Sequence, residues 1–461
     1  MQNFFTTYSV RTTALMSAVL ILLGITACDS KDEVSQNHNT QKKYTTLDSN
    51  APKIIAHRGL SGLYPEQTRI AYEKAADAGA DMLELDMHMT KDCQLVARHN
   101  AWLSDSTNIL QIAQNNKDFA SRKRTTPGVL VDLGYDVKIY GGPEKLLIDL
   151  VDPQNTSSVL AALVVDGEDH TNDWSVSDFT LEELKNQLKG TILDNKAERP
   201  TDQNGIYSII SAQDVVDIAR QKGKELGKVI EVYAESKNPY WNNAQAKANG
   251  CVGEKPFEEA IVKLLEVNDL NREDAPIYIQ SFDPESIKFM RNKGLKAKAV
   301  QLFDGDSINF ETGEVINITN DEQTFVTGRP YSWTLAGNPK TFADMQTEEG
   351  LKEIATYAQG IGPWKTQLLA HKVEPYFSGA KLSDVNKLED TGLVEKAHKA
   401  GLVVHTFTLR SDPSRLAGIF KGDPLEEYFA YFRIGTDGVF TDFTDHGVQA
   451  LKKYTEEVDN K

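Results

Sequence analysis

The chain has 461 residues, of which 40% are hydrophobic and 25% are charged, and its formal net charge is −17. This composition is typical of a globular domain, and the length fits one α/β barrel with insertions. The negative charge disfavours nucleic acid and anionic membrane surfaces as partners, so we expect no nucleic-acid binding. Cations are not disfavoured, and acidic clusters are therefore candidate metal sites.

The first residues predict an export signal. Residues 12–27 (TTALMSAVLILLGITA) form an apolar run behind Arg11, and this run is too short and too weakly flanked for a stable membrane span. Its last three residues and the following Cys28 read ITAC, which resembles a bacterial lipobox whose cysteine becomes lipidated. We therefore expect a signal peptide over 1–27 and a lipid-anchored Cys28, with an ordinary signal peptide as the alternative.

Residues 28–50 are polar and lack periodicity, which predicts a disordered tether. The protein is thus expected to be exported to the cell envelope, periplasmic or at the surface, and to touch the membrane through its lipid anchor only. Three cysteines do not define a disulfide framework. If Cys28 is lipidated, Cys93 and Cys251 remain; a bridge between them is allowed in an exported protein, and the sequence leaves it open.

Beyond residue 51, short apolar runs alternate with polar, helical segments, which is the pattern of βα units. Strands are expected at 53–59, 82–90, 94–99, 228–237, 276–282, 296–303, 402–409 and 438–442, with a shorter candidate at 360–365. No Gly-rich phosphate loop opens the chain, so we predict a (β/α)8 TIM barrel over 51–455 rather than a doubly wound sheet. Long excursions at about 101–227 and 304–358 are expected as insertions on one rim, where they would shape the pocket mouth.

Acidic side chains interrupt two of these apolar strands. In MLELDMHMT, alternation places Glu84 and Asp86 on one face, toward the barrel interior. In VIEVYAESK, Glu235 reaches the same interior from another strand, two residues before Lys237. Buried carboxylates are costly unless they are paired or bind a metal, and three of them suit Ca²⁺ or Mg²⁺ better than zinc. The alternative for Glu235 is an internal ion pair with Lys237.

Two histidines end predicted strands, His57 in KIIAHRG and His99 in QLVARH. Active sites of such barrels lie at the carboxyl ends of the strands, and histidine titrates near neutrality, so one imidazole can act as base and the other as acid. The planar guanidinium of Arg58 can grip phosphate oxygens. With the acids and Lys237, these residues predict a site for an anionic phosphoester. His88, on the acidic face, is interpreted as a hydrogen-bonded bystander.

At these residues the sequence resembles the glycerophosphodiester phosphodiesterase family. The resemblance is carried by AHRGLSGLYPEQT and GADMLELDMHMTKDCQLVARHN, then by ESKNP, IQSFD, VVHTFTLRSD and GTDGVFTDF, and it spans about residues 52–445. GIGPWK and TLRSD look like the periplasmic bacterial branch. The resemblance implies a metal-dependent barrel that hydrolyses glycerophosphodiesters to sn-glycerol 3-phosphate and an alcohol, with one divalent cation, Ca²⁺ favoured over Mg²⁺.

Carried over by position, the resemblance implies His57 and His99 as the acid–base pair, Glu84, Asp86 and Glu235 as metal ligands, and Arg58, Lys237 and Phe407 as phosphate or substrate contacts. It also implies attack of the glycerol 2-hydroxyl on phosphorus through a cyclic phosphate. The chain departs from the family at Asn100, where an aspartate usually follows the histidine, and at Cys93, where a turn glycine is usual. The alternative function is a surface-anchored lipoprotein that binds ligands on the same fold with little or no turnover.

Overall fold

The computed structural model describes residues 44–124, 164–165, 168–169, 172–192, 198–305, 307–317 and 328–460. The expected signal segment 1–27 and Cys28 lie outside these residues. Within the expected tether, residues 44–50 are described and pack on the barrel: the ring of Tyr44 is buried against Tyr454, and the Leu47 N–H donates to Asp437. The packed domain therefore begins by Tyr44, ahead of the expected start at residue 51.

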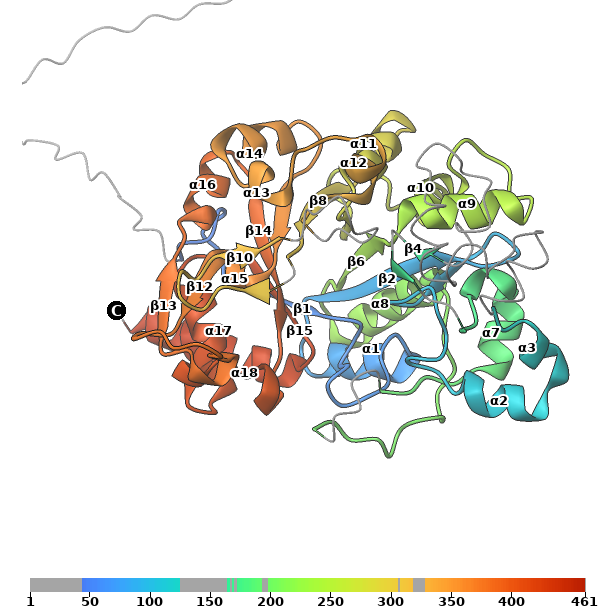
Figure 1. The fold of residues 1–461 in the computed structure, drawn as a ribbon, viewed down its shortest axis with the longest axis horizontal. Coiled ribbons are helices and arrows are strands. Elements are labelled where there is room, and N and C mark those ends of the chain that lie inside the picture. Colours follow the sequence, from blue (N-terminus) through green and yellow to red (C-terminus); the bar gives the residue numbers. More distant parts are fainter. Residues whose placement is uncertain are drawn as a thin grey trace, which may run out of the picture. The chain divides into compact units, whose positions relative to one another are not determined.

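Eight parallel strands close into a barrel (Figure 1). Each strand pairs with the next one in chain order, and the last pairs with the first. They are β1 (Lys53–Ala56), β2 (Met82–Met89), β6 (Glu231–Ser236), β7 (Ile277–Ser281), β8 (Lys298–Phe303), β11 (Gly360–Pro363), β14 (Val403–Leu409) and β15 (Gly438–Thr441). The predicted TIM-type barrel is confirmed.

A helix follows each barrel strand and covers its outer face. These helices are α1 (Arg69–Asp77), α8 (Ala212–Leu226), α10 (Pro256–Val267), α11 (Pro284–Asn292), α14 (Glu348–Ile354), α16 (Leu393–Lys399), α17 (Pro424–Arg433) and α18 (Thr444–Asp459). Helix α8 shows how the sequence builds one: Ser211 and Asp214 form a capping box at its start, and Gly227 ends it with φ 65°. Its buried Val215 packs in the same apolar cluster as Leu83, on the outward face of β2.

Aromatic side chains fill the barrel interior. Tyr233 stacks on Tyr278 with ring centroids 5.0 Å apart and meets Phe440 edge-on at 5.0 Å. The Tyr233 hydroxyl is 3.0 Å from Nδ1 of the buried His405. The centre of the barrel is thus a packed core rather than a pore, and it leaves polar chemistry to the carboxyl ends of the strands.

The expected strand at 94–99 is not part of the closed barrel. Its structured part, β3 (Leu95–Ala97), pairs antiparallel with β2, with Ala97 opposite Met87. The connection from β2 is too short for a crossover helix, which a parallel pair requires, so the chain can only reverse. The Arg98 N–H then donates to the carbonyl of Asp86, and the chain returns along β2 toward its middle.

The stretch expected as the first excursion, 101–227, also contains the crossover helix α8. Its other described elements are α2 (Ile109–Asn115), α3 (Lys117–Ser121), β4 (Val164–Val165), β5 (Glu168–Asp169), η1 (Val176–Asp178) and α7 (Leu181–Gln187). It has a small core of its own around Phe119, Trp174 and Phe179. This core holds the excursion in a defined fold beside the barrel.

Other excursions also leave the barrel. The one expected at 304–358 includes the crossover helix α14 and carries β9 (Ser307–Ile308), β10 (Val315–Ile316), α12 (Tyr331–Leu335) and α13 (Phe342–Met345). Segments that were not expected are α9 (Pro239–Ala248), α15 (Lys365–Leu368), β12 (Leu369–Lys372), η2 (Leu382–Asp384), β13 (Lys387–Asp390), η3 (Pro413–Arg415) and η4 (Gly418–Phe420). Within the described ranges, no helix combines the length and apolarity needed to cross a bilayer.

A disulfide joins Cys93 to Cys251, across 158 residues of sequence, with Cα atoms 5.8 Å apart. Cys93 lies in the turn between β2 and β3 and adopts φ 62°, a left-handed conformation that glycine adopts with less strain. Cys251 follows α9. The bridge therefore ties the turn that precedes His99 to the segment that follows β6, and it answers the pairing question that the sequence left open.

Candidate active site

Three carboxylates meet at the end of the barrel interior. Glu84 and Asp86 come from β2, and Glu235 comes from the neighbouring β6, where it lies in register with Asp86. One oxygen of each lies within 4.8 Å of the others, and all three residues are at most 5% exposed. The structure thus brings together the three predicted metal ligands, although 149 residues separate Asp86 from Glu235.

The electrostatics of this cluster favour a bound cation. Burial raises the pKa of Glu84 well above its usual value, and the charge of Asp86 adds to the effect. Burial also raises the pKa of Glu235, against the opposing influence of Lys237. For Asp86, burial is outweighed by Lys237 and Arg58, and its pKa is lowered. Three buried oxygen donors that repel one another as anions fit a hard divalent ion, which would stabilise all three in their charged form.

A further oxygen lies beside the cluster. The Gln280 side chain, from β7, places its Nε2 3.3 Å from Glu84 Oε1, while its own Oε1 is buried without a hydrogen-bond partner among the described residues. Gln67 also supports the acids: its Nε2 donates to Asp86 Oδ2 over 2.6 Å. Neither residue was predicted; Gln280 lies in IQSFD and Gln67 in PEQT, and both motifs were read only as parts of a resemblance.

Arg58 is held by the acids from both its backbone and its side chain. Its N–H donates to Glu84 Oε2 over 2.8 Å, Nη1 donates to Glu66 Oε2 over 2.8 Å, and Nε lies 3.3 Å from Asp86 Oδ2. Its φ is 58°, a strained conformation for a non-glycine residue, and such strain is often found at functional sites. The next residue, Gly59, continues the turn with φ 85°, also in the left-handed region. The guanidinium is therefore fixed beside the cluster before any ligand arrives.

His57, which follows β1, forms a pair with Asp442, which follows β15. His57 Nδ1 lies 2.5 Å from Asp442 Oδ1, while Nε2 has no hydrogen-bond partner among the described residues. Since the carboxylate can only accept, Nδ1 carries the proton and Nε2 presents its lone pair. Burial and the nearby Arg58 lower the pKa of His57 to about 4, although Asp442 opposes them. Asp442 was missed in the sequence, where it lies in GVFTDF among ordinary strand-end residues.

His99 reaches the same cluster by the antiparallel return of β3, not from the end of a barrel strand as expected. Its Nε2 lies 3.1 Å from Lys237 Nζ, and its Nδ1 is buried without a hydrogen-bond partner among the described residues. Lys237 also lies 3.3 Å from Glu235 Oε1 and 3.7 Å from Asp86 Oδ1. Burial, Arg58 and Lys237 lower the pKa of His99 well below its usual value, so its imidazole is neutral.

His88 supports His99 rather than the acidic cluster. Its Nε2 lies 3.1 Å from the His99 carbonyl oxygen, and its Nδ1 lies 3.0 Å from Asn242 Nδ2. The carbonyl can only accept and the amide NH₂ can only donate, so both ring nitrogens are occupied. This arrangement matches the bystander interpretation. Asn100, next in the chain, donates to Asp105, which also accepts from Arg98 over 3.1 Å. A carboxylate thus lies beside residue 100, although the chain has no aspartate at that position.

Phe407 lies on β14 at the aromatic side of the site. Its ring meets Phe282 edge-on with centroids 5.8 Å apart and Phe440 at 6.5 Å. Lys237 Nζ lies 5.7 Å from the centre of the Phe282 ring, so the aromatic group borders the charged cluster. Phe407 is therefore placed to offer an apolar surface next to the predicted phosphate contacts.

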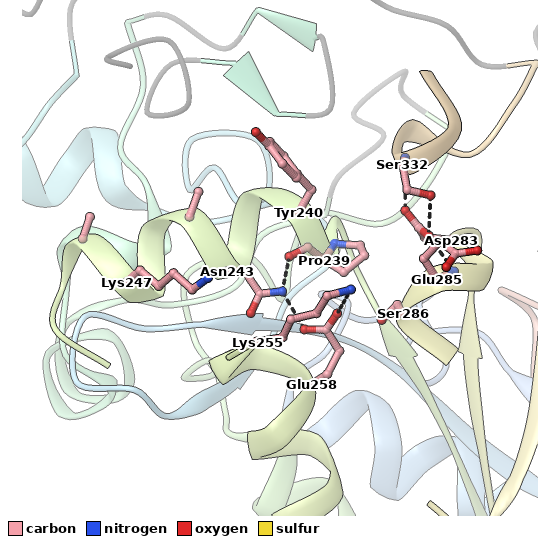
Figure 2. A pocket seen from close by; sticks show the side chains of 12 residues that line it. Pro239, Tyr240, Asn243, Lys247, Lys255, Glu258, Asp283, Glu285, Ser286 and Ser332 are labelled. Carbon is pink, nitrogen blue, oxygen red and sulfur yellow. Dashed lines mark hydrogen bonds and ion pairs between the residues drawn. The ribbon is translucent and has the colours of Figure 1, made fainter. Parts of the chain in front are cut away.

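A cavity of about 550 Å³ lies apart from this cluster, between α9, α10, α11 and α12. Figure 2 shows that its buried charged groups have partners in the cavity wall. Asn243 Nδ2 donates to Glu258 over 2.6 Å, Lys255 lies 3.9 Å from Glu258, and the Ser332 hydroxyl donates to Asp283 over 2.7 Å. None of the described site candidates lines this cavity. The chemistry is therefore assigned to the acidic cluster with its two histidines.

Comparison with known proteins agrees with the sequence resemblance. The family model described as "Glycerophosphoryl diester phosphodiesterase family" matches residues 57–446. The glycerophosphodiester phosphodiesterase GDPD6 of Arabidopsis thaliana is 30% identical over 452 residues, which cover 95% of this chain and 97% of that protein. A glycerophosphodiester phosphodiesterase of Haemophilus influenzae is 26% identical over 94% of this chain and 97% of its own. Among solved structures, an Oleispira antarctica phosphodiesterase in complex with the product sn-glycerol-3-phosphate covers 88% of this chain and 99% of its own, at 15% identity and a TM-score of 0.45.

Proposed function

We propose a mechanism from one premise: this chain belongs to the glycerophosphoryl diester phosphodiesterase family and is a glycerophosphodiester phosphodiesterase. The substrate is a deacylated phospholipid, and the products are sn-glycerol 3-phosphate and an alcohol. The observation that carries the mechanism is the convergence of Glu84, Asp86 and Glu235 within 4.8 Å, beside the buried His57 and the partly buried His99.

Glu84, Asp86 and Glu235 would hold one divalent cation, with Ca²⁺ favoured over Mg²⁺ because Ca²⁺ accepts several carboxylate oxygens, whereas Mg²⁺ is usually bound through one or two carboxylates and keeps its waters. The ion would supply charge to polarise the phosphoryl group and to lower the pKa of the attacking hydroxyl. Arg58 would donate to phosphate oxygens, since its guanidinium is fixed beside the acids. Lys237, which now contacts His99 and two acids, would provide a second cation for the same anion.

The two histidines differ in their surroundings, and this difference supports separate roles. Asp442 opposes the effect of burial and Arg58 on His57 and would stabilise the imidazolium once Nε2 takes up a proton, so we assign His57 as the general acid that protonates the leaving alcohol. Arg58 and Lys237 disfavour protonation of His99, so we assign His99 as the base that takes the proton from the glycerol 2-hydroxyl. The oxygen would then attack phosphorus to form a cyclic phosphate, and water would open this ring with the two roles reversed.

The test is a coupled assay that measures release of sn-glycerol 3-phosphate from glycerophosphocholine and from glycerophosphodiesters with other headgroups. We expect the parent to turn over, and His57→Ala and His99→Ala each to lower kcat by about 10²–10⁴-fold, the usual contribution of a positioned acid or base. His371→Ala is the matched control, since this histidine is buried on β12, outside the acidic cluster, and its Nδ1 donates to the Leu369 carbonyl oxygen over 2.8 Å. Histidine variants that turn over as fast as the parent would disprove the mechanism, and a parent that binds substrate without turnover would favour the ligand-binding alternative.

We further propose that the protein is exported, in the manner of the periplasmic bacterial branch, and anchored through a lipid on Cys28. The support is the sequence alone: the apolar run over 12–27 and the ITAC that its last three residues form with Cys28. In a bacterial host fed a labelled fatty acid, the parent should incorporate label and fractionate with the envelope. Cys28→Ser should lose the label, and a parent without label would refute the anchor.

A further inference from the structure

Arg199 reaches the catalytic end of the barrel from the first excursion. Its guanidinium makes a bidentate ion pair with Asp412, with Nε 2.8 Å from Oδ1 and Nη2 2.7 Å from Oδ2. Nη2 is also 2.6 Å from Asp442 Oδ2, and Nη1 donates to the Ser61 carbonyl over 3.3 Å. The side chain is only 8% exposed, and both acids are 4% exposed at their side chains. This arginine is therefore built into the wall of the site.

The Asp442 carboxylate links Arg199 to His57. Oδ1 accepts from His57 Nδ1 over 2.5 Å, while Oδ2 accepts from Arg199 over 2.6 Å and from Arg410 Nε over 3.0 Å. The two oxygens are thus fixed from opposite sides, and the carboxylate cannot rotate without breaking a charge-assisted hydrogen bond. The plane of this carboxylate sets the direction of the His57 ring.

The two arginines on Asp442 differ in how firmly they are held. Arg410 is 29% exposed at its side chain and contributes one bond through Nε. Arg199 is more buried, binds two carboxylates and one carbonyl, and its guanidinium lies 5.5 Å from the ring centre of Phe443, next to Asp442. Its neighbour Glu198 accepts from the Ser414 hydroxyl over 2.6 Å, which is a separate surface anchor for the same segment.

We propose that Arg199 is a positioning residue. Its guanidinium, which the excursion brings to the barrel, fixes Asp442 against His57 Nδ1 and so orients His57 Nε2 toward the substrate. The excursion is then part of the acid–base machinery as well as the pocket mouth. A lysine could not replace this residue fully, since one ammonium lacks the planar set of donors that reaches both acids at once. The inference rests on the proposed role of His57.

The experiment compares Arg199→Ala, Arg199→Lys and Glu198→Ala in steady-state release of sn-glycerol 3-phosphate. Arg199→Ala should lower kcat by about 10- to 100-fold, the scale expected when a catalytic group is misplaced by about 1 Å. KM should change by less than about threefold, because the phosphate contacts are untouched, and added guanidinium ion should restore part of kcat. Arg199→Lys should lie between alanine and the parent. Glu198→Ala removes the neighbouring anchor without touching Asp442 and should leave kcat within about twofold of the parent.

The pH profile separates positioning from loss of folding. The charged and titratable groups around His57 that remain in the variant are Asp442, Arg58, Arg410, Asp86 and His99. Arg199 lowers the pKa of Asp442, and Asp442 raises the pKa of His57, so removing Arg199 changes the support that Asp442 gives His57 and should move the kcat/KM limb that belongs to His57. A purely structural role would lower the amount of folded protein and leave the limb in place.

Three results overturn the inference. They are a kcat for Arg199→Ala within about twofold of the parent, an equal loss in Glu198→Ala, or an unshifted pH limb with no rescue by guanidinium. His57→Ala is measured alongside. If it retains full turnover, the proposed mechanism fails as well; if it is inactive while Arg199→Ala is normal, only the role of Arg199 is wrong.

Discussion

The disulfide between Cys93 and Cys251 makes a stability prediction whose size follows from the chain it closes. The bridge closes a loop of 158 residues. The chain-entropy relation gives about 5 kcal/mol for a loop of this length, and measured effects are typically about 2–4 kcal/mol. We therefore expect the double variant Cys93→Ser/Cys251→Ser to lose about 2–5 kcal/mol in the free energy of unfolding.

The assay is urea unfolding of the parent and the double variant, each with and without reductant. The parent should lose stability when reduced, with a lower urea midpoint, and approach the midpoint of the double variant. The double variant should not respond to reductant, and because Cys28 is still present in it, it controls for thiol effects elsewhere. A parent midpoint that is the same in both redox states would refute the reasoning.

Three further predictions concern separate parts of the molecule. Glu84→Gln should weaken Ca²⁺ binding in calorimetry by at least about tenfold, since a charged donor is lost from a buried set of three; unchanged affinity would place the ion elsewhere. Gly59→Ala should cost about 2–4 kcal/mol, because its φ is 85° and a Cβ would lie 2.6 Å from the Ala71 carbonyl carbon. Gly205→Ala, at φ 74° with open space around it, should cost only about 1 kcal/mol in the same denaturation experiment, and equal losses would contradict this. Burial lowers the pKa of His405 to about 4, so its stabilising contribution is complete above pH 6.5 and is lost as pH falls toward 4. His405→Gln should therefore flatten the fall in stability between pH 6.5 and 4, by up to about 1.4 kcal/mol per pH unit, and an unchanged slope would count against it.

The local patterns in the sequence were sufficient for the barrel and for much of the site. Alternation with period 2 placed Glu84 and Asp86 on one face of β2, and both side chains do lie in the acidic cluster. The same rule placed Glu235 on the inner face of β6. Such predictions succeed because side-chain direction along a strand is a local property of the backbone.

Contacts between distant segments were not available from local patterns. His99 was expected at the end of a barrel strand, but it reaches the site because β3 turns back along β2. Asp442 is 385 positions from His57, and Arg199 is 243 positions from Asp442. No periodicity distinguishes these residues from other strand-end acids or loop arginines, since their partners are fixed only by the closed fold.

The central claim is that one divalent cation in the acidic cluster is needed for turnover. The direct measurement is release of sn-glycerol 3-phosphate from glycerophosphocholine by metal-free protein during titration with Ca²⁺. The account predicts negligible release in chelator and an increase that saturates at one ion per chain, with Glu84→Gln and Glu235→Gln unable to recover at that concentration. Full turnover in the presence of chelator would contradict it.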